Sequence, residues 1–266
     1  MKTLELASRN GTLVYDDLGT GLPVVLLHAF PFDRAMWSPQ LAPLPEAGFR
    51  VLAPDFPGFG ESRACSEGFT IDSAADMISE FLQGLAIPRA VVAGLSMGGY
   101  VALAFARRHP DQLAGLILAD TRAAADDASG KEARNNTIAT VKANGPAAVG
   151  ASMLPKVLSE QSQANPAILG LARTLVTRQS AEGMIAALTA LRDRPDAAGS
   201  LNEIAVPTLV LVGEHDAITP PLTAARLGAN IRGSELIHIP GAGHLSNLEN
   251  PTAFNQAVLA FLKRMR

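Results

Sequence analysis

The chain has 266 residues, of which 48% are hydrophobic and 18% charged, and its formal net charge at pH 7 is −3. This balance excludes intrinsic disorder, and the length fits one large domain or one domain with an insertion. No segment concentrates basic residues as nucleic-acid binding would require. Cys65 is the single cysteine, which excludes an intrachain disulfide and a cysteine-built zinc site, and a cytoplasmic location is expected.

Neither an export signal nor a membrane span is expected. Met1–Asn10 carries Glu5 and Arg9 where a signal peptide needs an apolar core. The longest charge-free run, Ala90–Ala106, is interrupted by glycines and is shorter than the roughly 20 residues that cross a bilayer. We therefore expect no membrane partner and no nucleic-acid partner.

The first element is a predicted β-hairpin. Thr3–Ser8 and Thr12–Asp16 flank Asn10-Gly11, a dipeptide that favours the tight turn between two antiparallel strands. We expect this hairpin to form an antiparallel edge of a larger sheet.

Short apolar runs rich in β-branched residues then predict buried strands. In chain order they are Val24–Leu27, Val51–Ala53, Val91–Ala93, Leu116–Ala119, Thr208–Val212 and Leu236–Ile239. Helical periodicity lies between them over residues 71–85 and 100–108. This alternation predicts an α/β fold with a mostly parallel sheet and helices on both faces.

Between Arg122 and Asn202 the β-branched runs stop and the periodicity becomes helical. We interpret residues 122–202 as a helical cap inserted into a core domain of residues 1–121 and 203–266. The expected cap helices are Lys131–Ala143, Pro146–Leu154, Pro166–Arg178 and Ala181–Arg192, the last capped by Ser180. Asn250-Pro251 then predicts the start of a terminal helix.

The strongest chemical signal is Gly94-Leu95-Ser96-Met97-Gly98, a GxSxG motif directly after a predicted strand and before a helix. A turn this tight exposes the serine at the carboxyl edge of the sheet, and a β-carbon two residues to either side would clash. The helix also points its first N–H groups to this place, where they favour negative charge. Ser96 is therefore the candidate nucleophile.

A serine hydroxyl needs an imidazole base, and the imidazole needs an orienting carboxylate. His244 follows the last predicted strand and is the candidate base. Asp216 follows Thr208–Val212 at the same edge and is the preferred acid, while Asp120, after Leu116–Ala119, is its rival. For the other histidines we favour packing, capping, loop support or surface positions; they are His28, His109, His215 and His238.

The order of these motifs resembles the α/β-hydrolases, most closely the branch of small carboxylesterases, enol-lactonases and cofactor-free perhydrolases. The resemblance covers nearly the whole chain. It rests on His28-Ala29-Phe30-Pro31 with Trp37, Asp55-Phe56-Pro57-Gly58-Phe59-Gly60-Glu61-Ser62, the elbow extended to Gly99, Asp216, and Gly243-His244 before Asn250-Pro251.

The resemblance implies an α/β-hydrolase fold that works without a cofactor or metal. It also implies an oxyanion hole made by the backbone N–H groups of Phe30 and Met97. The family pattern usually has glycine where this chain has Ala29. Dehalogenase and epoxide-hydrolase relatives use an aspartate nucleophile and are set aside because the elbow carries Ser96.

The expected activity is hydrolysis of small carboxylic esters through an acyl-enzyme intermediate. Lactones, such as enol-lactones, carbon–carbon bond hydrolysis and perhydrolysis remain open because they use the same three side chains. A ligand-binding receptor with negligible turnover is the alternative from a different class. We expect Arg122 and Arg134 of the cap to be solvated or paired, and only a carboxylate-bearing substrate would give them a role. The oligomeric state is left open.

Overall fold

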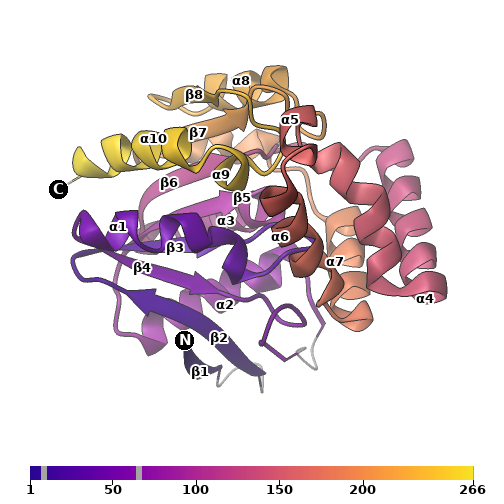
Figure 1. Cartoon of the computed structure of the whole chain (residues 1–266). Helices are drawn as coiled ribbons and strands as arrows, with labels where there is room; N and C mark the ends of the chain where they lie inside the picture. Colours follow the sequence, from indigo (N-terminus) through magenta and orange to yellow (C-terminus); the bar gives the residue numbers. More distant parts are fainter. Residues whose placement is uncertain (7–10, 64–67, 266) are drawn as a thin grey trace.

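The computed structural model describes residues 1–6, 11–63 and 68–265, and within them eight strands form one sheet (Figure 1). Their order across the sheet is β1-β2-β4-β3-β5-β6-β7-β8. The strands are β1 (Lys2–Leu6), β2 (Gly11–Leu18), β3 (Leu22–Leu27), β4 (Phe49–Pro54), β5 (Ala90–Leu95), β6 (Leu113–Ala119), β7 (Thr208–Gly213) and β8 (Glu235–Ile239).

The predicted sheet is confirmed. The ladders from β3 and β4 through β8 are parallel, whereas β1 pairs with β2, and β2 with β4, in antiparallel fashion. The hairpin thus gives the sheet its antiparallel edge. Four residues named in the sequence analysis, Ser8, Arg9, Asn10 and Cys65, lie outside the described residues.

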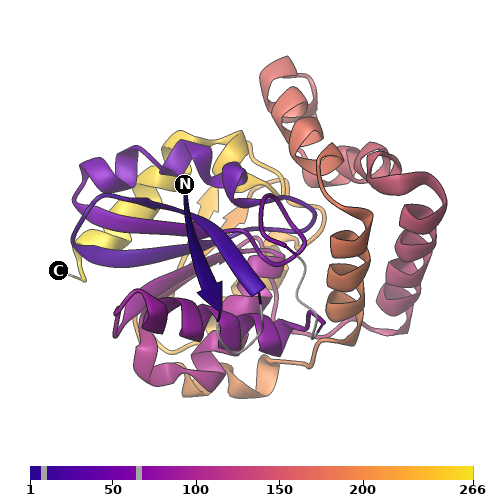
Figure 2. The same ribbon diagram turned by 90° about the horizontal axis from the view of Figure 1, so that it is seen from below.

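Helices cover both faces of the sheet. Figure 2 shows α1 (Pro43–Glu46) and α10 (Pro251–Lys263) on one face, and α2 (Ile71–Gly84) and α3 (Met97–Arg108) on the other. Two further helices, α8 (Pro221–Ala229) and α9 (Ser246–Glu249), follow β7 and β8. The side chain of Asn250 accepts a hydrogen bond from Ala253 N at 3.1 Å, so it caps α10 as its Asn-Pro sequence predicts.

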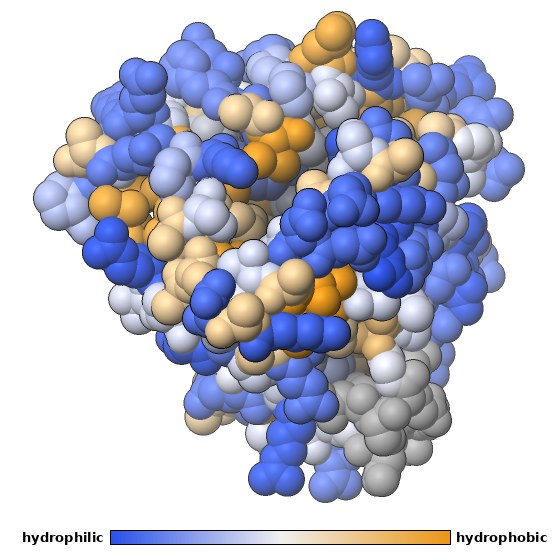
Figure 3. Space-filling model, turned by 90° about the vertical axis from the view of Figure 1, so that its right-hand side faces the viewer, coloured by the Kyte–Doolittle hydropathy of each residue, from blue (hydrophilic) through white to orange (hydrophobic). Residues whose placement is uncertain are grey.

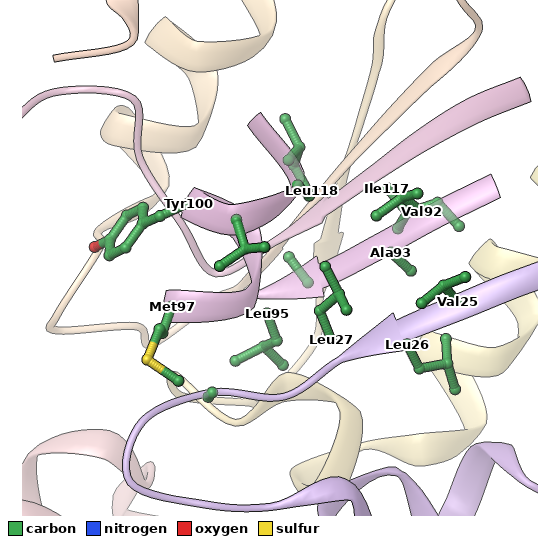
Figure 4. Close-up of a cluster of buried hydrophobic side chains, with 14 of the residues drawn as sticks. Val25, Leu26, Leu27, Val92, Ala93, Leu95, Met97, Tyr100, Ile117 and Leu118 are labelled. Carbon is green, nitrogen blue, oxygen red and sulfur yellow. The ribbon is translucent and has the colours of Figure 1, made fainter. Parts of the chain in front are cut away.

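The core lies where the central strands meet α3. Every residue of β5 and β7 is buried, whereas the edge strands β1 and β8 are mostly exposed. Strands that are covered on both faces carry continuous apolar sequences instead of alternating ones, and these are the runs that predicted them. Figure 4 shows side chains of β3, β5 and β6 packed beside Met97 at the start of α3; among them are Val25, Leu27, Val92, Leu95, Ile117 and Leu118.

Four helices between β6 and β7 form a lobe beside the sheet (Figures 1 and 2). They are α4 (Ala128–Val157), α5 (Glu160–Gln163), α6 (Pro166–Thr177) and α7 (Ala181–Asp193). We call this lobe the cap; its boundaries at residues 122 and 202 stay a prediction. Gly145, at φ 75° and ψ 179°, divides α4 into two helical segments. These segments correspond to the two helices predicted for Lys131–Ala143 and Pro146–Leu154. The short helix α5 was not expected.

The surface of the cap is mostly polar. Figure 3 shows the side of the molecule that carries the cap, where hydrophilic residues predominate and apolar ones show between them. Of the helices in the described part of the chain, none has both the length and the apolar character that a membrane span needs.

Polar contacts hold the cap to the core. Arg178, which ends α6, donates from Nε to Asp33 Oδ2 at 2.6 Å, and Gln179 Nε2 donates to the same oxygen at 2.6 Å. Asp33 is fully buried. Burial favours a raised pKa for Asp33. The hydrogen bonds that its carboxylate accepts from Arg178, Ala35 N and Gln179 outweigh this effect and lower the pKa. The ion pair therefore holds the end of α6 against the loop after β3.

Glycine allows α3 to approach the sheet closely, and this predicts a large effect of Gly98→Ala. A β-carbon on Gly98 would overlap the carbonyl oxygen of Leu27, which is backbone and cannot turn away. We expect the variant to lose about 3 kcal/mol of unfolding free energy, the upper range of overpacking effects. Chemical denaturation measures the loss.

Gly170→Ala is the matched control. Gly170 lies within α6, and an added β-carbon there meets no atom within 4 Å. Alanine in a helix interior is favoured over glycine by roughly 0.5–1 kcal/mol, so this variant should be equally or more stable than wild type. Equal losses at the two positions would contradict the steric explanation.

Candidate active site

Ser96 stands at the turn between β5 and α3. Its backbone has φ 54° and ψ −109°, a conformation that side-chain-bearing residues rarely adopt. The turn is tight because a β-carbon on Gly94 would overlap the backbone of Gly98. Ser96 N donates to the carbonyl of Ala119 at 3.0 Å, which fixes the turn to β6. Packing thus holds the strained backbone in place.

The structure brings the predicted serine, histidine and aspartate into one hydrogen-bonded chain. His244 Nε2 lies 2.9 Å from Ser96 Oγ, and His244 Nδ1 lies 2.8 Å from Asp216 Oδ2. His244 and Asp216 are 4% and 3% exposed. A proton on Nδ1 that is shared with Asp216 leaves Nε2 free to accept the serine proton.

The carboxylate of Asp216 is held in its orientation by its own loop. Oδ1 accepts hydrogen bonds from the backbone N–H of Ile218 and Thr219 at 2.8 and 2.9 Å, and Oδ2 accepts from Thr219 Oγ1 at 2.6 Å. Burial favours a raised pKa for Asp216, but the charge and hydrogen bond of His244 and the bonds from Thr219 lower it. Asp216 therefore stays ionised beside the imidazole. Sequence reasoning missed Thr219, although its place three residues after an aspartate is typical of such a turn.

The rival acid, Asp120, has other partners. Its Oδ1 accepts from Gly213 N at 2.8 Å and its Oδ2 accepts from Ser246 Oγ. These bonds join the end of β6 to the end of β7 and to α9, and within the described residues the carboxylate makes no hydrogen bond to His244. Complete burial, and then the charge of Asp216, raise the pKa of Asp120 well above its usual range.

The two backbone groups expected to form an oxyanion hole lie next to Ser96. Phe30 shares a cavity with Ser96, and Met97 follows Ser96 in the chain. Among the described residues, neither Phe30 N nor Met97 N donates a hydrogen bond to a protein acceptor. Buried N–H groups are nearly always paired, so two free donors beside a serine hydroxyl are suited to an oxygen of a bound ligand.

His28 fixes the loop that carries Phe30. Its Nε2 accepts from Phe56 N at 2.9 Å, which leaves Nδ1 to donate to the carbonyl of Ala29 at 3.0 Å. Burial lowers the pKa of His28 and keeps the ring neutral, although the charge of Asp55 acts in the opposite direction. This agrees with the expected loop-supporting role of His28.

With this geometry in view, comparison with known proteins identifies the family. A family profile described as the alpha/beta hydrolase fold matches residues 23–251. The chain belongs to the α/β-hydrolase family. It is 31% identical to the AB hydrolase superfamily protein YisY of Bacillus subtilis (strain 168), over 94% of this chain and 95% of that protein.

Two solved structures show how closely the fold is shared. A thermophilic esterase from Thermogutta terrifontis is similar with a TM-score of 0.96 and 38% identity, over 100% of this chain and 99% of that one. An enol-lactonase from Burkholderia xenovorans LB400 is similar with a TM-score of 0.90 and 28% identity, over 98% of this chain and all of that one. This α/β-hydrolase thus has both esterases and lactonases among its structural neighbours.

A cavity of about 250 Å³ lies over Ser96 and His244 in this α/β-hydrolase. The cap supplies most of its walls, because residues of α4 and α7 face the elbow across it. The apolar lining is Phe30, Ala133, Met153, Val157, Leu188, Leu191 and Ile218, and the polar lining beyond Ser96 and His244 is Tyr100, Arg122, Arg134, Thr137 and Lys156. In the described part of the chain, no three His, Cys, Asp or Glu side chains gather as metal ligands.

Both cap arginines named from the sequence are paired, and their partner was missed. Asp126, with a side chain 1% exposed, accepts from Arg122 Nη2 and from Arg134 Nε, the latter at 3.0 Å. Arg194 Nη1 lies 2.9 Å from the same carboxylate. Lys156 was also missed as a lining residue. An aspartate in a loop and a lysine near a helix end give no sequence signal that they face a cavity.

The raised pKa of Asp120 makes a prediction about stability and pH. A carboxyl group whose pKa is raised by folding stabilises the fold while protonated, and this contribution is lost as the pH rises from about 4 through the folded pKa. Asp120→Asn cannot ionise. The unfolding free energy of the variant minus that of wild type should therefore become more positive with rising pH, as measured by urea denaturation at several pH values. A difference that is constant or falls with pH would contradict the buried-acid interpretation.

Proposed function

We propose that this α/β-hydrolase cleaves small carboxylic esters through an acyl-enzyme on Ser96. The observation that carries the proposal is the hydrogen-bonded chain Ser96–His244–Asp216 at a strained turn. The free N–H groups of Phe30 and Met97 beside it support the proposal. In the proposed mechanism Ser96 is the nucleophile, His244 is the base, Asp216 orients the base, and the two N–H groups form the oxyanion hole.

In the proposed first half-reaction, Ser96 Oγ attacks the ester carbonyl carbon while its proton passes to His244 Nε2. The carbonyl oxygen becomes an oxyanion that accepts hydrogen bonds from the N–H groups of Phe30 and Met97. Asp216 stabilises the imidazolium. The carbon–oxygen bond to the alcohol then breaks, and the alcohol leaves with the proton from His244.

In the second half-reaction, water replaces the alcohol. His244 Nε2 takes a proton from water as the water oxygen bonds to the acyl carbon. Collapse of this second tetrahedral intermediate breaks the bond to Ser96 Oγ, which regains the proton from His244. The products are a carboxylic acid and the regenerated enzyme, and no oxidant or reductant is needed.

Lactone hydrolysis is a second candidate, and the likeness to an enol-lactonase at 28% identity favours it. The same steps apply when the leaving oxygen stays tethered to the acyl group. Esters are preferred because the likeness to an esterase, at 38% identity over the whole chain, is greater. The cavity of about 250 Å³ has room for a small substrate of either kind.

The direct test is turnover of a panel of 4-nitrophenyl esters of increasing acyl length, with small lactones beside it, by wild type and by Ser96→Ala. We expect repeated turnover by wild type, fastest with short acyl groups, and loss of at least 10³-fold in kcat for Ser96→Ala. Release of 4-nitrophenol and a pH-stat provide the readouts. One stoichiometric burst followed by no turnover would instead indicate a binding protein.

The role of Asp216 is tested by Asp216→Asn. The amide keeps the shape of the side chain but favours the wrong imidazole tautomer, so we expect kcat to fall by up to ~10⁴-fold, as in serine proteases. Asp111→Asn, at an exposed position before β6, is the control. An Asp216→Asn enzyme as active as wild type would show that another group orients His244.

A further inference from the structure

The cavity over Ser96 carries an unexpected charge. Arg122, Arg134 and Lys156 line it, and no aspartate or glutamate is among its lining residues within the described part of the chain. The whole chain has a net charge of −3, so an excess of cations is not a general property of its surface. A site that takes only neutral esters needs no such charge, and partly burying it is unfavourable.

The buried carboxylate behind the cavity does not balance this charge. Asp126 is a single negative charge shared by Arg122, Arg134 and Arg194. Arg194 is the partner most deeply enclosed: its side chain is 2% exposed and its guanidinium lies 4.2 Å from the ring centroid of Tyr100. Arg194 and Asp126 therefore form a buried neutral pair, which leaves the charges of Arg122 and Arg134 as a surplus without a buried carboxylate of their own.

The surplus arginines also have unused donors. Arg134 contacts Asp126 through Nε, and within the described residues its Nη atoms make no hydrogen bond. Arg122 contacts Asp126 through Nη2, while its Nε is buried without a partner. An unsatisfied buried donor costs free energy, and the Nη atoms of Arg134 are available to an oxygen ligand. The planar guanidinium fork matches a carboxylate in both geometry and charge.

Lys156 adds a third cation to the lining of the same cavity. Its side chain is exposed and makes no ion pair or hydrogen bond with any described residue. It also lines a neighbouring surface groove that runs past Ser159 and His215. Lys156 thus lines both the groove and the cavity, and its charge attracts anions to this part of the surface.

We infer that the substrate carries a carboxylate in addition to the ester or lactone group, and that Arg122 and Arg134 bind it. This inference rests on the proposed function and narrows its substrate class. Apolar side chains such as Met153, Leu188 and Leu191 contact the short carbon chain between the two groups. A cavity of about 250 Å³ has room for a small monoester of a dicarboxylic acid or a small carboxylated lactone.

Matched substrate pairs test the inference. Monomethyl succinate and methyl butyrate differ on the acyl side by a carboxylate in place of a methyl group, and acetoxyacetate and ethyl acetate differ likewise on the alcohol side. We expect kcat/KM for the charged member to exceed that for the neutral member at least ten-fold in one pair or the other. The preference should shrink as salt is added, because salt screens the attraction.

Variants identify the residues responsible. Arg134→Gln should lower the ratio of charged to neutral kcat/KM at least ten-fold, while Arg173→Gln, at an exposed position on α6, should leave that ratio unchanged. Arg134 also holds Asp126, so Lys156→Gln serves as a second variant that breaks no described contact. It should lower the ratio by a smaller factor, and Lys142→Gln, exposed on the same helix, is its control.

Binding without turnover separates the two proposals. We expect calorimetry with the Ser96→Ala protein to show monomethyl succinate binding at least ten-fold more tightly than methyl butyrate, and Arg134→Gln in that background to remove the difference. If wild type turns over the neutral esters as fast as the charged ones and monomethyl succinate binds no better than methyl butyrate, the inference fails while the esterase proposal stands. If no ester is turned over yet monomethyl succinate binds selectively, the esterase proposal fails and the anion site stands.

Discussion

The close approach of α3 to the parallel strands constrains the rest of the molecule. Gly98 lies against the carbonyl of Leu27, and Gly94 lies against Gly98, so the helix starts where a side chain would not fit. The backbone of Ser96 is held at φ 54° as a result. This strain is maintained by the buried core around it and not by the turn itself. Because Ser96 is fixed at the carboxyl edge of β5, groups that follow β6, β7 and β8 meet it there.

The cap contributes to the site as well as covering it. The backbone N–H of His244 donates to the carbonyl of Val157 at the end of α4 at 2.9 Å, so the loop that carries the imidazole is anchored to a cap helix. Arg178 binds Asp33 in the loop that also carries Phe30. A displacement of the cap would therefore alter both the base and the expected oxyanion hole. The position of the cap and the geometry of the groups around Ser96 are coupled through these few polar contacts.

Two buried carboxylates with opposite pKa shifts lie behind His244. Asp216 faces the imidazole and receives hydrogen bonds from Thr219, so it stays ionised, whereas burial and then the charge of Asp216 raise the pKa of Asp120. One negative charge beside the imidazole is enough to orient and stabilise it, and a second would be unfavourable in so buried a place. The cap also presents cations to the cavity over Ser96. The site thus has a negative group beside the base and positive groups in the wall of the cavity over Ser96.

The sequence by itself determined the class of fold and the candidates for chemistry. Buried parallel strands carry continuous β-branched runs, helices repeat every 3.6 residues, and a tight strand-to-helix turn demands glycine around Ser96, so each of these features follows from local physics. Local rules also located Asp216 and His244 at strand ends. They favoured Asp216 over Asp120 but left Asp120 as a rival, because the two follow adjacent strands and the final choice depends on which loop reaches the imidazole.

Only the tertiary structure decided which distant groups meet. Asp126 and Arg194 are far apart in the chain, yet they lie 2.9 Å apart because the cap folds back on itself. The surplus charge of Arg122 and Arg134 follows from that pairing and from the cavity wall they share with Ser96. Sequence patterns indicate the periodicity and the ends of helices and strands. They do not indicate which side chains face each other across a cavity. The electrostatics of the site therefore belong to the fold as a whole.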